Sequence, residues 1–138
     1  MKKILVLCTG NSCRSQIAHG YLELFGKSNV KIYSAGVEVH GVNPTAIKIM
    51  KEDGIDISYN TSNHIDEYQS INFDYIITVC DHAKESCPFI LHKTAVKIHK
   101  NFFDPSKADS ESKLYLDSFR KLRIQISEYC KDFIKNIV

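Results

Sequence analysis

One stretch near the N-terminus decides the fold: residues 2–15, which read KKILVLCTGNSCRS. After two lysines, residues 4–7 form a continuous run of Ile, Leu and Val, which is typical of a strand buried on both faces of a parallel sheet, so we predict a strand over residues 2–7. Turn-forming residues 9–12 follow directly. Apolar side chains then recur at helical spacing from Arg14 to Phe25, and Gly26 is a stop signal. The stretch therefore predicts a buried strand, a tight loop and a helix.

The rest of the chain repeats this alternation of strand and helix. Further strands are predicted over residues 30–34, 73–79 and 95–98. Asn43 and Pro44 are the N-cap and first-turn signals of a helix that Gly54 closes. A long terminal helix is predicted because its apolar residues keep spacings of three and four: Phe119, Leu122, Ile126, Tyr129, Phe133 and Ile137. The pattern predicts a single α/β domain over residues 1–138, with a four-stranded parallel sheet and helices on both faces.

Composition excludes several classes of protein. Five cysteines in 138 residues are too few for a secreted disulfide scaffold, and 43% hydrophobic with 25% charged residues is ordinary globular usage. A net charge of +2 without a dense basic stripe indicates neither nucleic acid nor an acidic membrane surface as partner. No apolar run approaches the roughly 18 residues of a membrane span. We expect a cytoplasmic protein, in which thiols stay reduced and cysteines serve reactivity or ligation.

The loop after the first strand is a predicted oxyanion site. Backbone N–H groups and the N-terminus of the following helix favour a bound tetrahedral anion, and the guanidinium of Arg14 can bind two of its oxygens. The same dipoles are expected to lower the pKa of Cys8 and make it a nucleophile, with Ser15 as a hydrogen-bond donor to the thiolate. The predicted oxyanion-binding residues are Thr9, Gly10, Asn11, Ser12, Cys13, Arg14 and Ser15.

Two plainer interpretations of this loop fit its residues less well. Cys8 alone would be interpreted as a buried thiol at the end of a strand, but five residues separate it from Arg14-Ser15, and this Cys-x5-Arg-Ser pattern between strand and helix favours catalysis. A nucleotide-binding P-loop requires Gly-x4-Gly-Lys-Ser/Thr, and no such run occurs in the sequence. Cys80 and Asp104 follow the third and fourth predicted strands, so both are expected at the same sheet edge as Cys8.

The motif CTGNSCRSQ at residues 8–16 resembles the low-molecular-weight protein tyrosine phosphatase superfamily, and most closely its thioredoxin-coupled arsenate reductases. The resemblance continues through YSAG at 33–36, HGVNP at 40–44, GIDIS at 54–58, the segment from Cys80 to Cys87-Pro88, and Asp104-Pro105. It implies a phosphatase-like fold with flavodoxin-like strand order, Cys8 as nucleophile, Asp104 as general acid, and Cys80 and Cys87 as relay thiols. It also implies a small oxyanion substrate and thioredoxin as partner.

Reduction and hydrolysis would share Cys8 and Arg14, but only reduction needs further thiols. Reducing As(V) to As(III) takes two electrons, which two thiols supply by becoming a disulfide. The ends of neighbouring strands are close enough for a disulfide between Cys8 and Cys80, and Cys87 can then resolve it by thiol exchange. If residues 81–86 are helical, oxidation must change the order of segment 81–90, and tryptic cleavage at Lys84 is expected to rise on oxidation.

Arsenate reduction is thus the first functional prediction. A phosphatase acting on phosphotyrosine or small phosphate esters is the alternative, and a non-catalytic oxyanion sensor is a third class. Structural zinc prefers Cys-x2–4-Cys pairs, which the sequence lacks. Cys13 and Cys130 are interpreted as packing residues.

We expect no cofactor and no metal ion. Some of the reductases that the chain resembles bind potassium through two acidic residues, and His19 and Asn63 stand at those positions, although Asn11, Ser34 and Thr61 match. We also expect a monomer.

Overall fold

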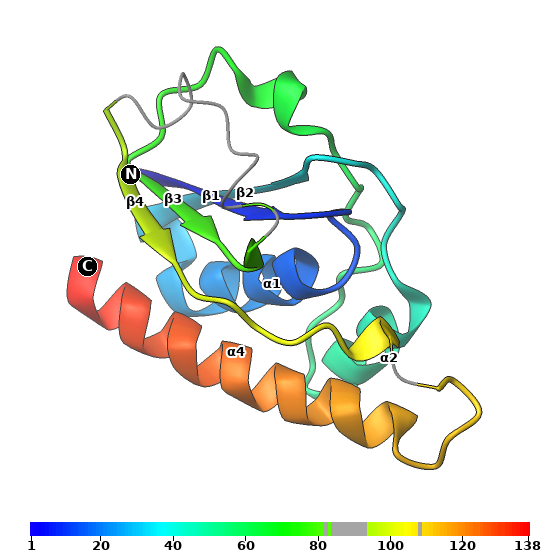
Figure 1. The fold of residues 1–138 in the computed structure, drawn as a ribbon. Helices are drawn as coiled ribbons and strands as arrows, with labels where there is room; N and C mark the ends of the chain where they lie inside the picture. The colour runs from blue at the N-terminus through cyan, green and yellow to red at the C-terminus, as the bar shows by residue number, and fades with distance from the viewer. Residues whose placement is uncertain (82, 84–93, 108) are drawn as a thin grey trace.

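A parallel sheet forms the centre of the computed structural model, which describes residues 1–81, 83, 94–107 and 109–138. Within these residues its strands are β1 (Lys2–Cys8), β2 (Val30–Gly36), β3 (Tyr75–Thr78) and β4 (Val96–His99). Their order is β2-β1-β3-β4, and every neighbouring pair is parallel (Figure 1). The order reverses between β1 and β3, which is where ligands bind in open α/β sheets. The predicted fold class is confirmed.

The run of Ile, Leu and Val in β1 is buried because this strand lies between two others. Ile4, Leu5, Val6 and Leu7 are fully buried. The first two strands are longer than predicted because their register continues to the pair Cys8–Gly36. By contrast, β3 is shorter than the predicted 73–79, since it pairs with β1 only from Ile4 to Leu7. Strand β4 starts and ends one residue later than predicted.

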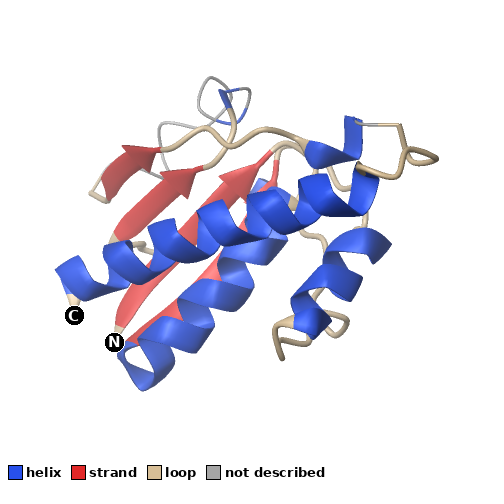
Figure 2. Cartoon of the chain, turned by 90° about the horizontal axis from the view of Figure 1, so that it is seen from below, coloured by secondary structure: helices blue, strands red, loops and turns tan. Residues whose placement is uncertain are grey.

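Helices α1 (Arg14–Gly26) and α4 (Tyr115–Ile137) lie side by side on one face of the sheet (Figures 1 and 2). Helix α4 begins before the first residue of its predicted apolar stripe, and its Phe133 ring packs edge-on against Tyr75 of β3, with centroids 5.4 Å apart. The opposite face is covered by the segment between α2 and β3. There the Tyr33 ring of β2 lies 5.3 Å from that of Tyr68.

Three short 3-10 helices complete the described structure, and none was predicted. They are η1 (Lys27–Asn29), η2 (Ile65–Tyr68) and η4 (Pro105–Lys107). The N-terminus of α2 (Pro44–Glu52) follows the prediction, because the Asn43 side chain accepts hydrogen bonds from the N–H groups of Thr45 at 2.8 Å and Ala46 at 3.1 Å.

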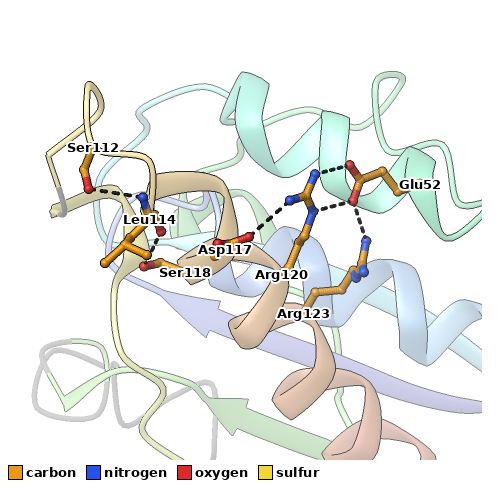
Figure 3. A network of polar contacts seen from close by, with 7 residues as sticks. All are labelled: Glu52, Ser112, Leu114, Asp117, Ser118, Arg120 and Arg123. Atoms are coloured by element: carbon orange, nitrogen blue, oxygen red, sulfur yellow. Dashed lines mark hydrogen bonds and ion pairs between the residues drawn. The ribbon is translucent and has the colours of Figure 1, made fainter.

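Helix α2 is joined to α4 by an ionic cluster (Figure 3). The Glu52 carboxylate accepts from Nε and Nη2 of Arg120 at 3.0 and 2.8 Å, and from Nη1 of Arg123 at 3.1 Å. Arg120 also donates to Asp117 at 3.3 Å. The Arg120 guanidinium, assisted by Arg123, lowers the pKa of Glu52 to about 2. The cluster stabilises the end of α2, whose N-terminus starts beside the loop that follows β1.

The carboxyl ends of β1 and β3 meet at one edge, and the chain after β4 returns to it. Within the described residues, none of the helices combines the length and the apolar character that crossing a bilayer requires.

Candidate active site

The loop between β1 and α1 surrounds a cavity of about 230 Å³. Chain segments far apart in sequence contribute to its wall: the loop itself, the turn before α2, and the loop after β4. The lining residues are Cys8, Thr9, Gly10, Ser12, Cys13, Arg14, His40, Asp104 and Ser106. The predicted meeting of Cys8 and Asp104 at one sheet edge is confirmed.

The carbonyl groups of this loop accept hydrogen bonds from the segment after β2. The carbonyl oxygen of Thr9 accepts from the N–H of Glu38 at 2.8 Å, that of Gly10 from the N–H of His40 at 3.0 Å, and that of Ser12 from the N–H of Asn43 at 3.0 Å. These carbonyl oxygens already have partners outside the cavity, and a strand–loop–helix concavity of this kind can bind anions through its N–H groups.

Asn11 and Ser15 brace the loop and do not line the cavity. Asn11 is fully buried and adopts a φ of 50°, a left-handed conformation that Asn tolerates better than most residues. Its side chain donates to Ser15 Oγ at 2.9 Å and accepts from the N–H of Asn63 at 2.7 Å. Ser15 Oγ accepts from Asn11, so its hydroxyl hydrogen remains available, and the role of Ser15 as donor to the Cys8 thiolate stays a prediction.

Gly36 is a loop-supporting residue that the sequence analysis missed. A Cβ added there would lie 2.7 Å from both the Thr9 carbonyl oxygen and the Asn11 nitrogen, and 2.4 Å from the Glu38 carbonyl oxygen. Backbone atoms cannot move aside as a flexible side chain can, so only glycine fits. The motif YSAG at 33–36 was the available signal.

Arg14 and Asp104 face each other across the cavity. Arg14 Nη2 lies 3.7 Å from Asp104 Oδ2, and Nη1 donates to the Phe102 carbonyl oxygen at 3.1 Å. The other carboxylate oxygen of Asp104 accepts from the N–H and hydroxyl of Ser106 at 3.0 and 2.6 Å. Arg14 is thereby placed to bind an oxyanion, and Asp104 to protonate a leaving oxygen. Ser106, which orients Asp104, was not predicted.

Cys8 and Cys80 are neighbouring buried thiols, each only 3% exposed. The hydrogen bond with Cys80, followed by burial, raises the pKa of Cys8 well above its ordinary value. The same bond, assisted by hydrogen bonds from Thr9 and Ala83, lowers the pKa of Cys80 to about 5. Thr9 Oγ1 lies 3.1 Å from Cys80 Sγ, and the N–H of Ala83 donates to that sulfur at 3.4 Å.

The expected lowering of the pKa of Cys8 is therefore wrong for this arrangement. In this arrangement Cys80 is the more acidic thiol, because its sulfur accepts hydrogen bonds from Thr9 and Ala83.

The other cysteines divide into two described thiols and one outside the described residues. Burial, followed by the nearby charge of Asp104, raises the pKa of Cys13 to about 12, and burial alone raises that of Cys130. Cys130 is 1% exposed and packs in the core. Cys87 lies outside the described residues, as do His82, Lys84 and most of the segment 81–90 for which an order change was predicted.

His40 is a further wall residue that was not predicted. Its ring lies against Gly10, where an added Cβ would be 2.2 Å from Nδ1. The imidazole therefore closes one side of the cavity and depends on the absence of a side chain at residue 10.

The positions compared with a potassium site bond to one another. His19 Nδ1 lies 2.8 Å from Ser34 Oγ, and Thr61 donates to Asn63 Oδ1 at 2.7 Å. Among the residues that the structure describes, no group of three or more His, Cys, Asp or Glu side chains is placed to hold a metal ion. A metal-free protein stays a prediction.

The chain is similar to known proteins both in sequence and in fold. The model of the low molecular weight phosphotyrosine protein phosphatase family matches residues 3–138. An arsenate reductase of Halalkalibacterium halodurans is 43% identical over 132 residues, covering 96% of this chain and 94% of that protein. Two solved structures cover all of both chains: an arsenate reductase in the phosphate-binding state, with a TM-score of 0.87 at 33% identity, and one in the oxidized state, with a TM-score of 0.86 at 32% identity.

Proposed function

Because the chain belongs to the low molecular weight phosphotyrosine protein phosphatase family, we propose that it is an enzyme of that fold which reduces arsenate to arsenite. The observation that carries the proposal is a further thiol beside the oxyanion loop: Cys80 Sγ lies 3.1 Å from the hydroxyl of Thr9, a loop residue. Hydrolysis of a phosphate ester has no use for this thiol, whereas reduction requires it.

The first step is binding and attack. Arg14 and the loop N–H groups hold the arsenate, and the sulfur of Cys8 bonds to arsenic while one arsenate oxygen leaves as water, protonated through Asp104. Cys8 attacks as its thiolate, so its proton has to leave the sulfur, and this proton contributes to the water that departs. Arsenic remains As(V) in the resulting Cys8 adduct.

The second step is the reduction. The Cys80 thiolate attacks the Cys8 sulfur, the sulfur–sulfur bond forms, and the pair of electrons of the broken sulfur–arsenic bond passes to arsenic, which leaves as arsenite. The lowered pKa of Cys80 favours this step, because the thiolate is the attacking species.

The cycle closes by thiol exchange. Cys87 attacks Cys80, freeing Cys8, and thioredoxin reduces the Cys80–Cys87 disulfide in the cytoplasm. This part of the proposal rests on the resemblance of the segment from Cys80 to Cys87 and on the spacing of the two thiols. We propose that the enzyme works as a monomer of one domain and without a cofactor.

Phosphatase activity is the competing function, since Cys8, Arg14 and Asp104 suffice for it. In the described part of the chain, no Phe, Tyr or Trp side chain lines the cavity, and the imidazole of His40 is the one ring in its wall. A phenyl ester would thus find little aromatic surface to pack against, whereas a free tetrahedral oxyanion needs none. We expect a weak aryl-phosphatase activity beside the reductase activity.

The test is thioredoxin-dependent arsenate turnover by the wild type, Cys80→Ser and Cys87→Ser, with Cys130→Ala as the control for loss of a thiol in the core. We expect both serine variants to lose repeated, thioredoxin-dependent arsenate turnover and keep aryl-phosphate hydrolysis, and the control to keep both. Arsenate turnover that survives both serine substitutions would refute the relay.

A further inference from the structure

Asp81, the residue after Cys80, is held by two side chains at and just beyond the carboxyl end of strand β4. Asp81 Oδ1 lies 2.7 Å from Nε2 of His99, the last residue of β4, and the N–H of Asp81 donates to Asn101 Oδ1 at 3.2 Å. The His99 side chain is 20% exposed and that of Asp81 is 73% exposed. Asp81 is thus tied by its carboxylate and by its backbone to the segment that leads from β4 to the acid loop.

The His99 ring is also held through its second nitrogen, Nδ1. Its Nδ1 lies 2.7 Å from Oγ1 of Thr78, the last residue of β3, which is fully buried. With a short contact at each ring nitrogen, the imidazole has one orientation. The contacts from Thr78 through His99 to Asp81, here called the histidine bridge, therefore span Cys80, with one anchor two residues before it and one directly after it.

We propose that His99 is a positioning residue for Cys80, acting through Asp81. This inference rests on the proposed function, in which Cys80 attacks the sulfur of Cys8. The Cys80 sulfur has two anchors of its own, the Thr9 hydroxyl and the N–H of Ala83. The second requires the N–H of Ala83 to stay close to the Cys80 sulfur, and the histidine bridge fixes Asp81, the residue directly after Cys80.

The geometry of the reaction makes such positioning matter. Formation of a disulfide tolerates little variation in the separation and direction of its two Cβ atoms. A displacement of about 1 Å can slow an enzymatic step by as much as 100-fold. Cys8 is the last residue of β1, where it pairs with Gly36 of β2, so the freedom that has to be removed is that of Cys80, which follows the short strand β3.

A role in positioning differs from a role in stability. A polar contact with one partner this exposed contributes little to folding. We therefore expect the histidine bridge to alter the rate at which Cys80 reacts with Cys8, while the melting temperature and the affinity for phosphate stay close to those of the wild type.

The experiment compares Asp81→Ala, His99→Ala, the double variant and Asp81→Asn, the matched control that loses the charge and keeps the hydrogen-bond acceptor. Two rates are measured on the full chain: arsenite release in a single turnover, and loss of the free Cys80 thiol on treatment with diamide, followed by peptide mass spectrometry. Phosphate affinity is measured by calorimetry.

We expect both alanine substitutions to slow each rate by about five- to tenfold, and the double variant to be no slower than either, because both remove the same contact. Asp81→Asn should retain most of the wild-type rate. Wild-type rates in the alanine variants, or effects that multiply in the double variant, would overturn the inference. If the wild type itself releases no arsenite, the proposed function fails, and the diamide rates alone decide whether His99 positions Cys80.

Discussion

Replacing Thr9 with valine removes one hydrogen bond from the Cys80 sulfur and nearly preserves the shape of the side chain. The hydroxyl lies 3.1 Å from a thiol that is 3% exposed and whose pKa is lowered to about 5. A hydrogen bond to a charged group contributes about 1.5–3 kcal/mol, and 1.36 kcal/mol corresponds to one pKa unit, so Thr9→Val should raise the pKa of Cys80 from about 5 to about 6 or 7.

The assay is the rate of alkylation of Cys80 by iodoacetamide as a function of pH, measured by mass spectrometry of the peptide that contains it. Its midpoint reports the lower of the two pKa values of the Cys8–Cys80 pair. Thr9→Ser is the matched control, because it keeps the hydroxyl, and its midpoint should stay near that of the wild type. An unchanged midpoint in Thr9→Val would show that the hydroxyl does not stabilise the thiolate, and the assignment of the charge to Cys80 would lose its main geometric support.

Three further predictions follow from the fold and the cavity. Gly36→Ala should cost about 1–3 kcal/mol of unfolding free energy in urea denaturation, since its Cβ would overlap backbone atoms of the loop, and should weaken phosphate binding; unchanged binding would contradict the close approach. Because Arg120 holds the pKa of Glu52 near 2, the contribution of Glu52 to stability is present above its ordinary pKa and is lost as the pH falls toward 2. The difference in Tm between wild type and Glu52→Gln should therefore shrink between pH 5 and pH 2, while Glu128→Gln, an exposed control on α4, should show no such trend. Asp104→Asn should lower aryl-phosphate hydrolysis by about 10²–10⁴-fold and leave phosphate affinity within a few-fold of wild type; a wild-type rate would exclude Asp104 as the acid.

Local rules explain what could be predicted from the sequence. Residues 4–7 are apolar without a break because both neighbouring strands cover them, and Asn43 caps its helix through atoms two and three residues away. The loop from Cys8 to Arg14 was predictable for the same reason, since its chemistry lies within one strand–turn–helix unit.

Contacts between distant segments explain what could not be predicted. The need for glycine at residue 36 arises from a loop about 25 positions earlier, and His40 reaches the cavity only because Gly10 lies beneath it. The charge on Cys80 was missed because it depends on the Thr9 hydroxyl, 71 residues away in the chain.

The most direct test of the account is a single turnover of the fully reduced chain with arsenate and no external reductant, in which arsenite and free thiols are counted together. The account predicts one arsenite per chain, the loss of two thiols, and a disulfide that includes Cys80; in Cys87→Ser this disulfide should join Cys80 to Cys8. Arsenate consumed without loss of thiols, or a full complement of free Cys80 after the reaction, would contradict it.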